Sequence, residues 1–128
     1  MRILSLAALG AVLVLACAPP STGRPVQEAN VITKEEILAT HTANVYDAIS
    51  RLRPNFLRYR GQTTIRGADT GFPKVYLDRM LYGDTNSLKN MNVNGIREIH
   101  FYNGPDAGAR FGLDNVSGAI EIISDTSQ

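Results

Sequence analysis

The chain has 128 residues, with 13 Lys and Arg against 12 Asp and Glu, so its formal net charge is only +1. A nearly neutral chain has no global field that would attract nucleic acid or an anionic membrane surface. The single cysteine excludes a disulfide within the chain.

The N-terminal segment has the features of an export signal. Arg2 gives a positive start, and residues 3–16 carry no charge and are rich in Leu, Ala and Val. This apolar run of about 14 residues is shorter than the roughly 20 of a membrane-spanning helix, but it suits a signal peptide. The run ends at Val14-Leu15-Ala16-Cys17, which resembles the lipobox of bacterial lipoproteins.

The lipobox resemblance implies that residues 1–16 are removed and that Cys17 begins the mature protein. In that family the cysteine carries a diacylglycerol, often with a further acyl chain such as palmitate, and two or more chains anchor a protein stably. By the same resemblance, Ala18 after the cysteine favours the outer membrane, with the domain facing the periplasm or, as the alternative, exposed at the cell surface. The alternative is an ordinary cleaved signal with a chance cysteine. Residues 17–30, which include three prolines, are expected to form a flexible tether.

A folded domain is expected over residues 31–124, followed by a short tail at 125–128. Val31-Ile32 reads as a short strand, and Thr33 to Glu36 has the form of a capping box that starts a helix. Thr42 is the candidate cap of a second helix, in which Val45, Ala48, Ile49 and Leu52 share one face. Pro54 should end that helix at or before Arg53.

Beyond Pro54 the apolar period changes to two, which predicts strands. Extended pieces are expected at Leu57 to Tyr59 and Thr63 to Arg66, and half-buried strands over Lys74–Met80, around Ile99 and Phe101, and around Ile120 and Ile122. Turn signals lie between them at Gly83-Asp84, Asn94-Gly95, Asn103-Gly104-Pro105 and Gly112. The predicted fold class is α+β: a small mixed sheet with one or two short helices.

The order of these segments along the chain gives a second resemblance. The segments on which it rests are Val31–Ile37, Val45–Leu52, Ile65–Gly67, Val75–Asp78, Ile96–Phe101, Gly104–Gly112 and Gly118–Ile123. Together they resemble the plug domain of TonB-dependent outer-membrane receptors over roughly residues 31–124. Arg79 stands where that family usually has Gly, Tyr102-Asn103 replaces Leu/Arg, and Phe111 replaces Tyr.

The plug resemblance implies a transport-related, non-enzymatic module. A complete receptor also needs a barrel of many strands, and Gln128 ends the sequence where a barrel would begin. We therefore expect a free-standing plug-like domain, held at the membrane through Cys17 and meeting an outer-membrane barrel or transport protein as its partner. No cofactor and no nucleic acid are expected.

Several residues have candidate roles within this picture. Gly104, Gly112 and Gly118 are expected at structural turns, with positive φ or a close backbone approach. Arg66 is expected to pair with Glu98 or Glu121 across the sheet, the alternative being an anion site.

Tyr76 and Tyr102 lie on the strand faces opposite the apolar residues. If those faces are open, the two tyrosines and Arg66 would mark an interaction surface, since tyrosine is favoured at interfaces. If helices cover the faces, the tyrosines belong to the core. The sequence leaves these alternatives open.

No motif for catalysis or metal binding is present. His41 and His100 lie in different elements without zinc spacing, and no nucleophile elbow or phosphate loop occurs. The main hypothesis is therefore a lipid-anchored protein-interaction or ligand-binding module linked to outer-membrane transport. The alternatives are a structural envelope lipoprotein without a specific ligand and, least favoured, a small hydrolase that uses Asp78, Asp84, Asp106 and Glu121.

Overall fold

The computed structural model describes residues 29–61 and 70–126, which form a five-stranded sheet in the order β1-β4-β5-β2-β3. The strands are β1 (Val31–Thr33), β2 (Lys74–Leu77), β3 (Met80–Gly83), β4 (Ile96–Tyr102) and β5 (Ala119–Ser124). β2 and β5 are parallel, and every other pair is antiparallel. The sheet is mixed, as predicted.

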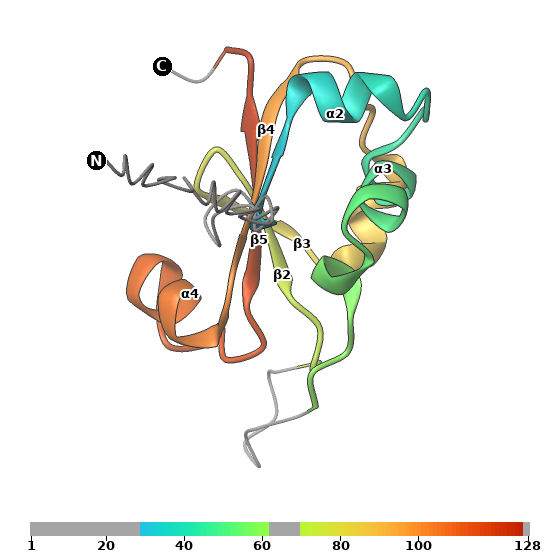
Figure 1. Cartoon of the computed structure of the whole chain (residues 1–128). Coiled ribbons are helices and arrows are strands. Elements are labelled where there is room, and N and C mark those ends of the chain that lie inside the picture. Colours follow the sequence, from blue (N-terminus) through green and yellow to red (C-terminus); the bar gives the residue numbers. More distant parts are fainter. Residues whose placement is uncertain (1–28, 62–69, 127–128) are drawn as a thin grey trace, which may run out of the picture.

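Helices cover both faces of this sheet (Figure 1). One face carries α2 (Lys34–Ala39), α3 (Val45–Leu52) and the 3₁₀ helices η1 (Pro54–Leu57) and η2 (Thr85–Asn90), and the other carries α4 (Gly104–Phe111). The larger core lies on the first side, where Ile49, Ile99 and Ile120 are fully buried. The α+β fold class is thus confirmed. Within the described residues, no helix has the length and apolar character needed to cross a membrane.

The first two helices, α2 and α3, each begin at a residue whose side chain caps the helix, and the sequence predicted one of these two caps. The capping box is confirmed: the Thr33 hydroxyl accepts from the Glu36 amide, and the Glu36 carboxylate accepts from the Thr33 amide. Thr42, however, does not cap α3. Asn44 takes that position because its side chain accepts from the Asp47 amide at 2.8 Å, whereas the Thr42 hydroxyl bonds to that of Thr40.

The segment after α3 is not a strand as far as Tyr59. Pro54 does end α3, but its fixed φ also suits the first turn of a helix, and residues 54–57 form η1 with Phe56 buried in the core. Tyr59 follows in irregular structure with its ring largely exposed. The extended piece predicted at Thr63 to Arg66 lies outside the described residues.

The stretch predicted as one strand over Lys74–Met80 is a hairpin. Asp78 and Arg79 have φ values of 47° and 71°, so the chain reverses there in a two-residue turn between β2 and β3. The apolar residues Leu77 and Met80, on either side of the Asp78-Arg79 turn, hid this reversal from the alternation rule.

The last two strands follow their patterns to different degrees. β4 alternates as predicted, with Ile99 and Phe101 buried and His100 half-buried. β5 is not half-buried: it lies between β4 and β2 with helices on both faces, so residues 119–122 are all buried. Glu121 is among them.

The residues read as a turn at Asn103-Gly104-Pro105 begin a third helix, α4, that was not predicted. Asn103 caps it by accepting from the Asp106 amide at 3.0 Å, and Pro105 lies in its first turn. A cap and an N-terminal proline are also turn signals, and an eight-residue helix with two glycines has weak apolar periodicity.

Candidate functional site

The α4 side of the sheet brings together the tyrosines that the sequence singled out. α4 covers this face, and Tyr76, Ala107 and Ala119 form a small buried cluster against which Tyr102 and Phe111 pack. Tyr76 is only 7% exposed, so it is not part of an open surface as one alternative held, whereas Tyr102 remains half-buried. The covered-face alternative therefore describes Tyr76.

Tyr76 is fixed at both ends of its side chain. Its ring stacks on that of Phe111, with centroids 4.0 Å apart and an interplanar angle of 16°. Its hydroxyl donates to the Asn115 side-chain oxygen at 2.9 Å, and the Asn115 amide nitrogen donates to the Gly112 carbonyl. A buried phenol needs such a partner, so β2, α4 and the α4–β5 loop are held together here.

An ion pair between a buried carboxylate and a partly exposed arginine lies next to these rings. Glu121, in the central strand, is 2% exposed, and one of its oxygens lies 3.1 Å from a terminal guanidinium nitrogen of Arg110. The Arg110 Nε also donates to this carboxylate at 3.2 Å, and the Tyr102 hydroxyl donates at 3.0 Å. A buried carboxylate is tolerated only when it is paired and hydrogen-bonded in this way.

The same pairing changes the acidity of Tyr102. Burial of the Tyr102 hydroxyl, its hydrogen bond to Glu121 and the negative charge of that carboxylate together raise its pKa to about 12. The positive charges of Arg110 and Arg79 act in the opposite direction on this pKa. Tyr102 is thus a hydrogen-bond donor here and not a source of phenolate near neutral pH.

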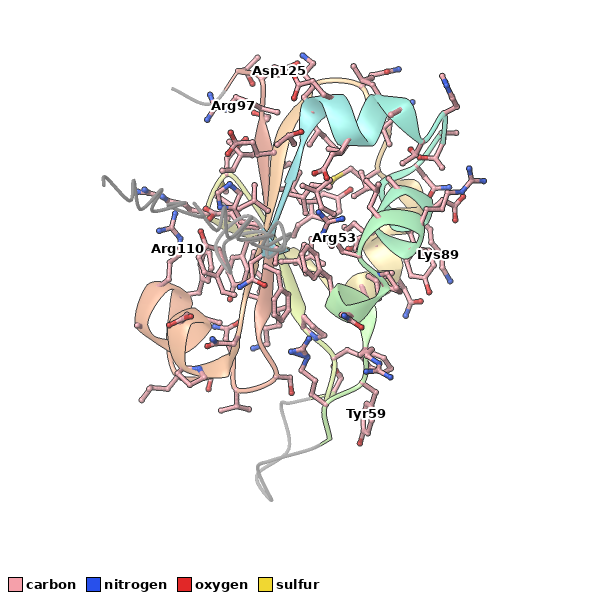
Figure 2. The ribbon with its side chains drawn as sticks, viewed as in Figure 1. Arg53, Tyr59, Lys89, Arg97, Arg110 and Asp125 are labelled. Atoms are coloured by element: carbon pink, nitrogen blue, oxygen red, sulfur yellow. The ribbon has the colours of Figure 1, made fainter. Side chains whose placement is uncertain are left out.

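A cleft opens beside the ion pair. It is lined by Tyr76, Arg79, Arg110 and Phe111 and has a volume of about 450 Å³. Figure 2 shows Arg110 on the α4 side of the sheet. Arg79 reaches the cleft from the β2–β3 turn, so the two cationic groups come from elements that are far apart in sequence.

The second notable surface is strand β3 at the edge of the sheet. Met80, Leu81 and Tyr82 are 76%, 62% and 44% exposed. Within the part of the chain that the structure describes, no strand pairs with the outer side of β3. An uncharged, apolar edge of this kind is a template for pairing with another chain.

Of the three predicted turn glycines, Gly112 and Gly118 lie in the loop after α4, whereas Gly104 is the first residue of α4 and not part of a turn. Gly104 and Gly118 approach other backbone: a side chain at Gly104 would meet the Val116 carbonyl, and one at Gly118 would lie 2.7 Å from the Tyr102 carbonyl oxygen. Gly118 has a φ of 95°, and Gly112, which follows α4, has a φ of 103°. These positions shape the loop that carries α4 back to the sheet.

Two candidate residues, Arg66 and Cys17, lie outside the described residues. The carboxylates proposed as partners of Arg66 have other partners within the described chain. Glu121 binds Arg110, and Glu98 lies 2.7 Å from the His100 Nε2. The pairing of Arg66 and the lipidation of Cys17 therefore stay predictions.

The carboxylates considered for hydrolysis have structural roles in separate elements. Asp78 accepts from the Ser124 amide and hydroxyl, Asp84 caps η2, and Asp106 lies in the first turn of α4. Among residues 29–61 and 70–126, no three His, Cys, Asp or Glu side chains lie close enough to hold a metal ion.

The ion pair and the cleft were missed by sequence reasoning. A single Glu within Ala119-Ile120-Glu121-Ile122-Ile123 was a usable signal, because a nearly continuous apolar strand is buried on both faces. A charge in such a strand must find a buried partner. Nothing in the sequence identified Arg110 as that partner, because α4 itself was read as a turn.

Comparison with known proteins agrees with this architecture. Residues 24–119 match the family model described as TonB-dependent Receptor Plug Domain. No match was found among curated proteins.

Proposed function

Because the chain belongs to the TonB-dependent receptor plug domain family, we propose that it is a lipid-anchored module that binds a protein of outer-membrane transport. The family is a transport-related, non-enzymatic module associated with the outer membrane and its periplasmic side. Family membership is the observation that carries the proposal. The lipobox at Cys17 supports anchoring, and the exposed strand β3 supports contact with a partner.

The contact has a definite chemistry. An extended segment of the partner would add to β3 as a further antiparallel or parallel strand, with main-chain hydrogen bonds supplying affinity. Apolar side chains of that segment would lie against Met80, Leu81 and Tyr82, the three exposed residues of the edge. Burial of this apolar surface adds about 25 cal/mol for each Å² removed from water.

The anchor and the contact are tested separately. Cys17→Ala should move the protein from the membrane fraction to the soluble periplasmic fraction and abolish labelling by a radioactive fatty acid. A wild-type protein without acyl label would contradict the anchor and leave the contact to be judged independently.

The contact is tested with a photo-crosslinking amino acid at Leu81, in intact cells. The matched control carries it at Arg51, which is exposed on α3. We expect an outer-membrane transport protein to be captured from position 81 and not from position 51. Equal capture from both positions, or none from position 81, would contradict binding through β3.

A further inference from the structure

We propose that the cleft between the β2–β3 turn and α4 binds a small organic acid, with its carboxylate on Arg79 and Arg110 and its apolar body against Phe111. This inference goes beyond the proposed partner contact, since the cleft lies on the α4 side and its lining residues are Tyr76, Arg79, Arg110 and Phe111. It does not depend on membrane anchoring.

The first observation is the backbone conformation of Arg79. Its φ of 71° is left-handed, a region in which a residue with a Cβ is strained and glycine is not. The neighbouring Asp78 also has positive φ, but Asp tolerates this region better. A strained arginine in a two-residue turn therefore weakens the hairpin, and such strain is typical of ligand sites. The strain is explained if the guanidinium has a ligand to bind.

The second observation is the local charge. Arg110 is balanced by the buried carboxylate of Glu121. Within the described residues Arg79 makes no ion pair, and the carboxylate of its neighbour Asp78 accepts from Ser124. Among the described residues that line the cleft, there are two cations and no carboxylate. With Glu121 counted, one positive charge remains to be balanced, which suits a monoanion.

The third observation is that the two cations act on the same place. Both arginines line one cleft, and the charge of each lowers the pKa of the same Tyr102 hydroxyl against the larger opposing effect of burial. Two guanidinium groups that converge from a turn and a helix provide several N–H donors for the two oxygens of a carboxylate.

The remaining wall of the cleft is aromatic. Phe111 is half-buried, and its position is fixed by stacking on Tyr76. The cleft volume of about 450 Å³ lies within the range of about 300–1,000 Å³ that small-molecule sites occupy. A fixed ring next to paired cations favours an acid with a flat or apolar body over a bare inorganic anion.

The test is a titration of the full-length chain with benzoate. Binding is monitored through the backbone amide and arginine Nε–H signals in ¹⁵N-resolved NMR spectra. We expect saturable shifts at Arg79, Arg110 and Phe111. Arg79→Gly removes the cation without straining the turn and should weaken binding about tenfold or more, since a charge-assisted bond contributes more than 1.4 kcal/mol. Arg58→Ala removes one exposed charge elsewhere and should bind as the wild type does.

Two further ligands test whether binding needs both the negative charge and the aromatic ring. Benzamide has the same ring without the charge, and inorganic phosphate has charge without the ring, so each should bind more weakly than benzoate. The proposal is overturned if benzoate gives no saturable shifts at these residues, if Arg79→Gly binds it as tightly as the wild type, or if phosphate or benzamide binds equally well.

Discussion

The Arg110 guanidinium closes over the Glu121 carboxylate at 3.1 Å, and the two side chains differ sharply in exposure: 38% for Arg110 and 2% for Glu121. The arginine therefore brings solvent-facing charge to a carboxylate that water does not reach. Loss of the arginine leaves the carboxylate in the sheet with the Tyr102 hydroxyl as its remaining described side-chain donor.

Arg110→Met should lower the free energy of unfolding by about 2 kcal/mol. Breaking a fully buried pair costs about 3–5 kcal/mol because a charge stays unpaired, and we expect less here because Arg110 is partly exposed. Urea unfolding followed by circular dichroism measures this change. Adding Glu121→Gln to the variant removes the orphaned charge and should recover most of the loss. Arg58→Met, at an exposed site, should stay within about 0.5 kcal/mol of the wild type.

The raised pKa of Tyr102 predicts a dependence of stability on alkaline pH. Its folded value of about 12 exceeds the unfolded value of about 10, so the folded state holds the proton more tightly. This contribution is complete below about pH 10 and is lost as pH rises through about 12.

Absorbance at 295 nm during an alkaline titration should show a late ionisation step near pH 12 that belongs to Tyr102. Tyr102→Phe should remove that late step, and Tyr82→Phe, at an exposed position, should leave it unchanged. Retention of the late step in Tyr102→Phe would contradict the assignment.

The sequence predicted best where local chemistry and tertiary packing agree. The capping box at Thr33, the end of α3 before Pro54 and the alternation of β4 depend on neighbouring residues, and all three are present. The prediction failed where one residue type has two uses. Asn103 and Pro105 suit both a turn and the start of a helix, and here they begin α4.

The candidate site was harder to predict because its parts meet only in three dimensions. Tyr76 and Tyr102 were identified as a pair of interest, but which face a helix covers cannot be read from alternation within a strand. Glu121 on β5 pairs with Arg110 on α4, and Arg79 reaches the cleft beside this pair from the turn between β2 and β3. Such a cluster follows from the order of strands in the sheet, which no local pattern encodes.

Arg79→Gly should stabilise the domain by about 1 kcal/mol. Left-handed backbone costs a residue with a Cβ roughly 1–2 kcal/mol, and glycine avoids this cost at φ 71°, although its unfolded chain has more freedom to lose. Arg79→Ala keeps the strain and should give no such gain. Thermal unfolding of both variants compares them directly, and equal stability of the Gly and Ala variants would argue against strain at this turn.

Gly118 and Gly108 should respond in opposite ways to the same substitution. Gly118→Ala places a Cβ 2.7 Å from the Tyr102 carbonyl oxygen at a φ of 95°, so both a backbone clash and an unfavourable φ oppose it; the loss should exceed about 2 kcal/mol. Gly108 lies inside α4, where an added Cβ meets no atom within 4 Å. There alanine should stabilise by about 0.5–1 kcal/mol, the usual difference in helix propensity.

Chemical denaturation of both alanine variants in parallel measures this contrast with identical side-chain chemistry. If Gly118→Ala unfolds at the wild-type denaturant concentration, the backbone at Gly118 does not contact β4 as described. If Gly108→Ala is destabilised, α4 does not extend through that residue as an ordinary helix. Because α4 carries Arg110 and Phe111, the same pair of variants also tests whether the wall of the proposed cleft is a helix packed on the sheet.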